Sequence, residues 1–189
     1  WLGLTAFKLP IDAYSTKIFF EPTLKNFQTI FLPPRSFGPM VVNSLVVSTV
    51  TVAITIPLAT LAAYAFSRYQ FKSKNVLLVW VLSTQFIPPV VVVLPFFTLF
   101  RDINLLDTRT GLIILNLSFT LPFAVWMIKG FIDALPPQIE EAAIVDGCHQ
   151  LQLLYYVTLP LVMPGIITSA VFTFIQSWNE FLFALILTR

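Results

Sequence analysis

Charged side chains are scarce in this sequence: Asp, Glu, Lys and Arg make up only 11% of its 189 residues. A soluble domain carries about a quarter of such residues, so water is not expected to be the main solvent of this chain. Cysteine and histidine are scarcer still, with one of each. A single Cys excludes an internal disulfide, and one Cys with one His makes a poor metal site. We expect neither metal ligands nor catalytic residues.

What remains is mostly apolar, with 57% hydrophobic residues and a mean hydropathy of +0.86. Four long intervals contain no Asp, Glu, Lys or Arg. A helix of roughly 20 apolar residues crosses a bilayer, so each interval can hold one span. The sequence therefore predicts an all-α, polytopic transmembrane helical bundle. Its expected spans are residues 41–66, 76–100, 111–128 and 165–187.

The ends of the chain suggest a fragment of a longer membrane protein. The first residue is Trp1, and the apolar segment that follows resembles the end of a helix. The last residue, Arg189, directly follows an apolar run. We expect residues 1–40 to hold the end of a preceding span and an external loop, and residues 41–189 to form the transmembrane domain.

The short loop 68–74 indicates which way the chain faces. It contains Arg68, Lys72 and Lys74 and no acidic residue, and short basic loops usually lie in the cytoplasm. By alternation, the loop 101–109 is external and the loop 133–158 is cytoplasmic. Four cations of the opening segment oppose this orientation, although the rule is weaker over a long stretch. They are Lys8, Lys17, Lys25 and Arg35.

The loop 133–158 gathers acidic residues, since the segment EEAAIVDGCH holds three of the nine in the chain. Pro136 and Pro137 are typical of a helix start, and acidic residues in the first turn complement the helix dipole. Gly147 permits a sharp change of direction. We predict a short cytoplasmic helix, a bend, and a second helix from about Gln150 toward the membrane.

Alone, this acidic segment could be any solvated helix, but its surroundings are more specific. Glu141-Ala142-Ala143, then Asp146-Gly147, then Leu159-Pro160-Leu161 and Pro164 resemble the EAA signature of the inner-membrane permease subunits of ABC importers. Cys148 stands where the family usually has Ala. Further similarity extends over Asn43-Ser44-Leu45, residues 62–68 and Trp178-Asn179-Glu180-Phe181. Together these motifs are similar to the carbohydrate-uptake branch, in particular the maltose-system permease that carries the EAA loop.

The resemblance implies a type I permease fold with six spans, of which this chain would hold about four to five. It places the chain in the plasma (inner) membrane of a prokaryote. It also implies that the loop docks on a separate ABC ATPase. The other implied partners are a second permease subunit, an extracytoplasmic substrate-binding protein and membrane lipid. No cofactor is expected in this chain, because ATP and Mg would be bound by the ATPase. The expected ATPase-coupling residues are Glu140, Glu141, Ala142, Ala143, Asp146 and Gly147.

Polar residues within the spans are candidates for a substrate pathway. Ser44, Ser48, Thr51 and Thr55 share one helix face, which suits either a sugar-binding cavity or helix packing. Pro88, Pro89 and Pro95 are expected to bend the second span. Glu180 is predicted at membrane depth, where it would border the pathway or pair with the partner permease. The candidates are Asn43, Ser44, Ser48, Asn116, Gln176, Trp178, Asn179 and Glu180, together with the weaker Ser118.

Other functions remain open at this stage. An ion-coupled transporter would need several intramembrane ionisable residues, and Glu180 is the one acidic residue predicted there. A membrane enzyme would need a catalytic cluster. An ABC importer of amino acids, peptides or anions would need charges along its path. The basic residues are dispersed, so we expect no nucleic-acid partner.

Overall fold

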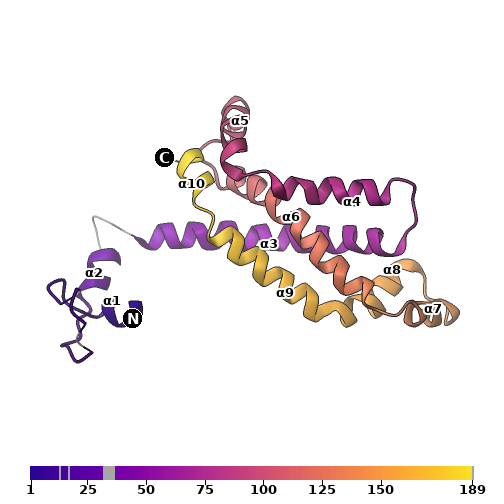
Figure 1. The fold of residues 1–189 in the computed structure, drawn as a ribbon, viewed down its shortest axis with the longest axis horizontal. Coiled ribbons are helices and arrows are strands. Elements are labelled where there is room, and N and C mark those ends of the chain that lie inside the picture. Colours follow the sequence, from indigo (N-terminus) through magenta and orange to yellow (C-terminus); the bar gives the residue numbers. More distant parts are fainter. Residues whose placement is uncertain (13, 17, 32–36, 189) are drawn as a thin grey trace. The chain divides into compact units, whose positions relative to one another are not determined.

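The computed structural model describes residues 1–12, 14–16, 18–31 and 37–188, and these residues form helices and connecting segments without a strand (Figure 1). They divide into two units, Trp1–Leu45 and Val46–Arg189. Helix α3 (Phe37–Arg68) begins in the first unit and ends in the second. The expected functional segments lie almost entirely in the second unit.

The first unit contains α1 (Leu2–Ala6) and α2 (Lys25–Phe31). Lys8 is buried here: its Nζ donates to the carbonyl of Ser15 at 2.9 Å and lies 4.7 Å from the centre of the Trp1 ring. This cation of the opening segment is therefore not a surface charge. Lys17 and Arg35 lie outside the described residues.

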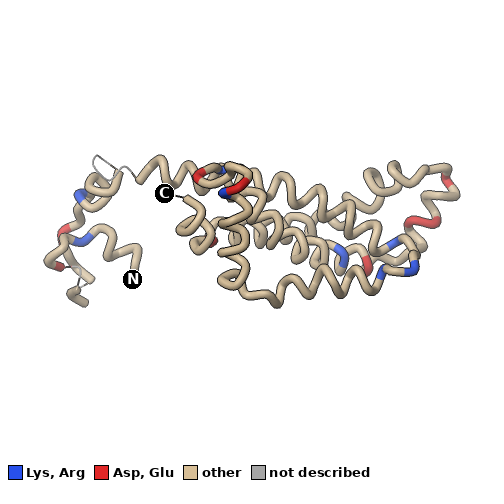
Figure 2. Tube along the Cα trace, turned by 90° about the horizontal axis from the view of Figure 1, so that it is seen from above, with Lys and Arg blue, Asp and Glu red and all other residues tan. Residues whose placement is uncertain are grey.

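Three helices of the described residues are long and apolar enough to cross a membrane: Phe37–Arg68, Arg109–Asp133 and Gln150–Trp178. A fourth span is formed if the bent pair Lys74–Phe86 and Pro89–Asp102 crosses as one. Within the second unit, charged residues lie in two groups at opposite ends of these helices, with an uncharged stretch between them (Figure 2). This is the charge distribution of a multi-pass membrane protein.

The second expected span, residues 76–100, is not one continuous helix. It consists of α4 (Lys74–Ser83), the 3-10 turn η1 (Thr84–Phe86) and α5 (Pro89–Asp102), which are bent by 95° at the break. Proline has no N–H and disfavours helical geometry in the residue before it, so consecutive Pro88 and Pro89 end one helix and begin the next. Pro95, by contrast, lies inside α5.

The last expected span, residues 165–187, was placed wrongly. Helix α9 (Leu159–Trp178) begins earlier, and it follows the short α8 (Gln150–Gln152) and the π-helix η2 (Leu153–Thr158) without interruption. Pro160 is the second residue of α9 and directly follows the π-helix. The chain then breaks after Trp178 and continues as α10 (Leu182–Leu187).

Two apolar clusters hold the second unit together. The first joins the later half of α3, the later half of α6 (Arg109–Asp133), η2 and the beginning of α9. The second joins α5, the beginning of α6 and α10; there Phe119 and Phe183 lie 5.0 Å apart, ring centre to ring centre. The second segments of the two broken spans, α5 and α10, thus pack in the second cluster, whereas residues of the loop 133–158 pack in the first.

Helices α6 and α9 approach closely at Gly165. A Cβ atom at this position would lie 2.2 Å from Cγ of Phe131, so any larger residue must displace the aromatic ring. Gly165 itself is buried, and interiors packed at this density tolerate added volume poorly.

We expect Gly165→Ala to lower stability by about 1–3 kcal/mol, the usual effect of overpacking. Gly130→Ala is the matched control, because nothing lies within 4 Å of a Cβ there. Unfolding of the detergent-solubilised protein measures both effects. The double variant Gly165→Ala/Phe131→Ala should recover part of the loss; equal stability of Gly165→Ala and Gly130→Ala would contradict the close packing.

Candidate functional site

The acidic loop forms a short helix, as the sequence predicts. Helix α7 (Pro137–Val145) begins with Pro136 as its N-cap and Pro137 as its first residue. The fixed φ of proline suits the first helical position, and its missing N–H needs no partner there. Glu140 lies in the first turn, where a carboxylate interacts favourably with the helix dipole.

Gly147 ends α7 in the left-handed region, with φ of +89°. Its N–H donates to the carbonyl of Ile144, and the N–H of Cys148 donates to the carbonyl of Ala143, each at 3.0 Å. These two bonds form a Schellman motif, which glycine favours because it lacks a Cβ. The predicted change of direction at Gly147 is therefore confirmed. His149 then caps α8, since its Nδ1 accepts the N–H of Gln152 at 3.4 Å.

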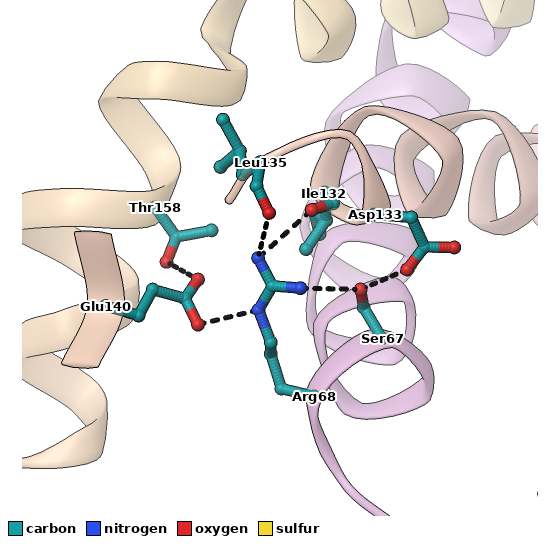
Figure 3. Close-up of polar contacts among 7 residues, drawn as sticks. All are labelled: Ser67, Arg68, Ile132, Asp133, Leu135, Glu140 and Thr158. Carbon is teal, nitrogen blue, oxygen red and sulfur yellow. Dashed lines mark hydrogen bonds and ion pairs between the residues drawn. The ribbon is translucent and has the colours of Figure 1, made fainter. Parts of the chain in front are cut away.

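An ion pair joins α7 to the end of α3 (Figure 3). Nε of Arg68 lies 2.6 Å from Oε2 of Glu140, which is 72 positions away in the sequence. The side chains are 18% and 8% exposed, respectively, so the pair is largely shielded from water. Nη2 of Arg68 also donates to the carbonyls of Ile132 and Leu135, at 3.1 and 3.5 Å. The guanidinium thus binds the end of α3 to α7, to the end of α6 and to the segment between α6 and α7.

Further polar contacts surround this ion pair. Ser67 donates a hydrogen bond to Asp133, and Asp133 also forms an ion pair with Lys129 (Figure 3 shows Ser67 and Asp133). On the other side, the hydroxyl of Tyr69 donates to Gln150 at the start of α8. These contacts place the loops 68–74 and 133–158 on the same side of the unit, as predicted.

The second oxygen of Glu140 connects α7 to η2. Oγ1 of Thr158 donates to Oε1 of Glu140 at 2.8 Å, and both residues are buried. Thr158 is the last residue of the π-helix, in which the N–H of Leu159 donates to the carbonyl of Leu154, five positions earlier. Such π-helices are rare and occur frequently at functional sites. Glu140 therefore contacts two membrane helices at once: α3 through Arg68 and the start of α9 through Thr158.

The structure separates the six expected coupling residues into two groups. Glu140 is only 6% exposed and faces the bundle, so it is not on the outer surface of the loop. Ala143 is half-buried. The exposed members are Glu141, Ala142, Asp146 and Gly147.

The outer surface of the loop is apolar for a segment outside the membrane. Val145 is 87% exposed, and Ile144 and Tyr155 are also exposed. Helical spacing places Gln138, Ala142 and Val145 opposite Glu140 on α7. These three residues define the outer face of α7. It is partly apolar, and the small side chain of Ala142 allows a partner to approach the helix closely.

The expected pathway residues are spread over α3, α6 and the end of α9. Asn43 and Ser44 are exposed, whereas Ser48 and Asn116 are buried; Ser118 is exposed. Ser48, Thr51 and Thr55 face the interior of the bundle, and Ser44 of the same helix face does not. Gln176, Trp178 and Asn179 are exposed at the end of α9, and the Trp178 ring stacks on Phe174 at 5.8 Å.

The sequence suggested that Glu180 lies within a continuous last span, and the structure shows that it does not. It occupies the break between α9 and α10, where its two carboxylate oxygens accept the N–H groups of Phe183 and Ala184 at 2.7 and 3.2 Å. An anion at the beginning of a helix satisfies backbone N–H groups that lack partners there. This carboxylate is therefore satisfied within the chain itself.

An open groove of about 540 Å³ lies between α4 and α6, away from all these predicted residues. Apolar side chains dominate its lining, among them Leu78, Leu82 and Trp126, with the Lys129–Asp133 ion pair at its edge. Such a lining offers few hydrogen bonds to a polar solute.

Sequence reasoning missed the role of three residues. Arg68 served as an orientation signal and as the end of the motif 62–68, and Thr158 and Asp133 served as loop boundaries. The Arg68–Glu140 pairing joins positions too far apart for any local pattern. Two features of the sequence could have pointed to it. Arg68 directly ends a long charge-free run, and Glu140 is a second acidic residue beside the motif residue Glu141.

Comparison with known proteins connects this geometry to a family. Residues 55–189 match the family described as binding-protein-dependent transport system inner membrane component. The chain is 40% identical, over its whole length, to a probable ABC transporter permease protein, y4oR, of Sinorhizobium fredii, and covers 68% of that protein. It is 36% identical to the trehalose transport system permease protein SugB of Mycobacterium tuberculosis, over 88% of the chain and 60% of SugB.

Two further comparisons agree. The diacetylchitobiose uptake system permease protein DasC of Streptomyces coelicolor is 31% identical over 100% of the chain and 69% of DasC. The crystal structure of a bacterial ABC transporter involved in the import of alginate superposes with a TM-score of 0.80, covering 100% of this chain and 67% of that one. Its sequence identity is 24%, so this likeness concerns the fold. The chain spans about two thirds of the length of such relatives.

Removing one member of the Arg68–Glu140 pair should be strongly destabilising, because it leaves the other charge buried without its partner. Glu140→Ala is expected to lower the free energy of unfolding in detergent by about 3–5 kcal/mol. Glu141→Ala, at the exposed neighbour, should stay within about 0.5 kcal/mol of the wild type.

The double variant Arg68→Met/Glu140→Leu tests whether the effect comes from the pair. It should be more stable than either single variant, since it buries no unpaired charge. Additive losses from the two single substitutions would show that the residues act independently.

Proposed function

Because the chain belongs to the family of binding-protein-dependent transport system inner membrane components, we propose that it is the permease subunit of an ATP-driven importer for sugars or oligosaccharides. The family and its apolar helices make it a multi-pass protein of the inner membrane. Transport by such a subunit is a mechanical task. Residues 137–147 receive the movement of a partner, and the attached membrane helices respond to it.

The cargo proposal is supported by the names of relatives and by the charge of this chain. Relatives are named for trehalose, diacetylchitobiose and sulfoquinovosyl glycerol, all of which carry several hydroxyl groups. The last also carries an anionic sulfonate, so these names support a cargo rich in hydroxyl groups, and only this chain itself supports a neutral one. The long charge-free intervals offer no counter-charge to an ionic solute, which agrees with a neutral cargo. Polar side chains beside an aromatic ring, as at Gln176, Trp178 and Asn179, suit sugar hydroxyls and the apolar face of a sugar ring.

The ATPase, which would bind ATP and Mg, is a separate chain in this proposal, since the sequence contains no phosphate-binding loop of the GxxxxGK[ST] kind. The outer face of α7 would dock on it. A second permease subunit and an extracytoplasmic substrate-binding protein would complete the importer. Docking on a cytoplasmic ATPase agrees with the basic loop 68–74, which lies on the same side as α7.

The buried Arg68–Glu140 ion pair is the observation that carries the mechanism. When closure of the ATPase displaces α7, Glu140 moves with it, and its two oxygens pull on Arg68 of α3 and on Thr158 at the start of α9. The displacement therefore reaches two spans without passing through a flexible loop. The exposed residues Glu141, Ala142 and Asp146 would contact the ATPase, and Glu140 would transmit the motion inward.

A bulky residue on the outer face should prevent docking and leave the fold intact. We expect Ala142→Trp to insert into the membrane yet to lose ATPase association and sugar-stimulated ATP hydrolysis. Asn75→Trp is the matched control, since it adds the same side chain at an exposed position in the first turn of α4, on the same side of the unit. Pull-down of the complex, ATPase activity and sugar uptake measure the effect.

Substitution of Gly147 tests the same segment through backbone strain instead of a steric block. Gly147→Ala places a Cβ in the left-handed region, which is unfavourable by roughly 1–2 kcal/mol, although no atom lies within 4 Å of that Cβ. Gly147→Asn should couple better than Gly147→Ala despite its larger side chain, because Asn tolerates this region. Full association and uptake of Ala142→Trp together with Gly147→Ala would remove this segment from the coupling mechanism.

A further inference from the structure

Hydroxyl-bearing side chains face the interior of the bundle on three membrane helices. On α3 and α9 they follow helical spacing, so that each set shares one face. All are at most 5% exposed. We call the following six residues the hydroxyl seam: Ser48, Thr51 and Thr55 of α3, Thr120 of α6, and Thr173 and Ser177 of α9.

One hydrogen bond crosses this seam. Oγ1 of Thr120 donates to the carbonyl of Asn116 at 2.9 Å, so its proton is already used. The hydroxyl oxygen of Thr55 lies 3.2 Å from that of Thr120, and Thr55 is therefore the donor in this pair. The bond fixes the contact between α3 and α6 at the middle of the helices.

The other four hydroxyls have no partner among the described residues: those of Ser48, Thr51, Thr173 and Ser177. Hydroxyl residues that serve helix packing usually donate back to a carbonyl of their own helix, as Ser169 does to Gly165 at 2.9 Å. A buried hydroxyl without a partner loses the hydrogen bonds it makes in water, which is unfavourable. The seam thus retains an unused capacity to bind a hydrogen-bonding molecule.

The seam begins near the middle of the helices and extends away from α7. Toward α7, the same three helices are joined by the first apolar cluster, by the Gly165–Phe131 contact and by the Arg68–Glu140 ion pair. Toward the other end, α6 and α9 still touch through Phe123 and Phe172, but the second apolar cluster includes none of the described residues of α3 or α9. Helix α9 stops at Trp178, directly after Ser177. A movement of α7 that tilts α3 and α9 would therefore separate them at the seam before the apolar cluster opens.

We propose that the hydroxyl seam opens during the transport cycle and forms part of the wall of the translocation path, where its free hydroxyls bind a neutral hydrogen-bonding molecule. Water and the hydroxyl groups of the cargo share this chemistry. The inference rests on the proposed importer function and extends it to residues that are buried in the closed arrangement seen here. The unpartnered hydroxyls are then satisfied in the open state and left without partners in the closed one.

Cysteine labelling tests this opening. In a Cys148→Ser background, Thr51→Cys and Thr173→Cys are introduced separately, and the assembled complex is reconstituted in liposomes with its ATPase and binding protein. A hydrophilic methanethiosulfonate reagent, which reacts with thiolates in water, is added with and without MgATP and trehalose. Ile54→Cys on α3 and Val171→Cys on α9 are controls, because these positions are exposed on the outside of the described bundle.

We expect the two seam cysteines to react at least several-fold faster during turnover than at rest, and the two controls to react equally in both states. Absence of labelling in both states, or equal labelling in both, would overturn the proposal. If excess trehalose slows labelling in a vanadate-arrested complex, the opened seam binds the hydroxyl groups of the cargo. Fast labelling without such protection assigns it to water, and either result supports the opening.

A second pair of variants replaces hydroxyls by methyl groups of the same shape. Thr51→Val/Thr173→Val should assemble with an equal or higher Tm, because it removes two unpartnered hydroxyls from the closed state. Uptake should fall, since the opened wall would lose its hydrogen bonds. Unchanged uptake would overturn the proposal. Labelling, ATPase activity and uptake are measured on the same vesicles. An unlabelled seam in vesicles that still couple ATP hydrolysis to uptake would contradict this proposal alone, whereas loss of ATPase activity and uptake would contradict the proposed importer function.

Discussion

The ion pair between Arg68 and Glu140 is the contact on which the arrangement of the loops depends. A guanidinium and a carboxylate at 2.6 Å, shielded from water, interact strongly only while each remains satisfied. Here the carbonyls of Ile132 and Leu135 and the hydroxyl of Thr158 supply the additional hydrogen bonds. The end of α3, the turn after α6, helix α7 and the π-helix therefore meet at one point, and displacement of any one of them disturbs the others.

Residue patterns predicted the helical class, two of the membrane helices in outline and the helix–bend–helix form of the loop 133–158. Each of these features depends on local chemistry: apolar length, Pro136 and Pro137 at a helix start, and Gly147 at a helix end. The buried position of Glu140 was not predictable in the same way. Its environment is created by Arg68, which lies far away in the sequence, and EEAA on its own suits a solvated helix equally well.

Hydropathy also did not predict the breaks in the second and last spans. Both α4–α5 and α9–α10 read as continuous apolar runs, but the 95° bend at Pro88 and the capping of α10 by Glu180 divide them. Their second segments, α5 and α10, pack together in one apolar cluster. The chain thus has one cluster near the loop 133–158 and another near the breaks, with the hydroxyl-bearing faces of α3 and α9 beyond the first. In the proposed opening, α3 and α9 would tilt about the first cluster, to which both helices contribute residues.

The central claim is that α7 and the end of α3 move as one body because Arg68 holds Glu140. Pulsed electron-paramagnetic-resonance distances between spin labels at Gln70 and Ile139 test it most directly in a Cys148→Ser complex, because both positions are exposed and neither belongs to the outer face of α7. The distance distribution should be the same in the nucleotide-free and vanadate-trapped complexes, and should broaden between the two states in the Arg68→Met/Glu140→Leu variant. A distance that changes between the two states with Arg68 and Glu140 intact would contradict the claim.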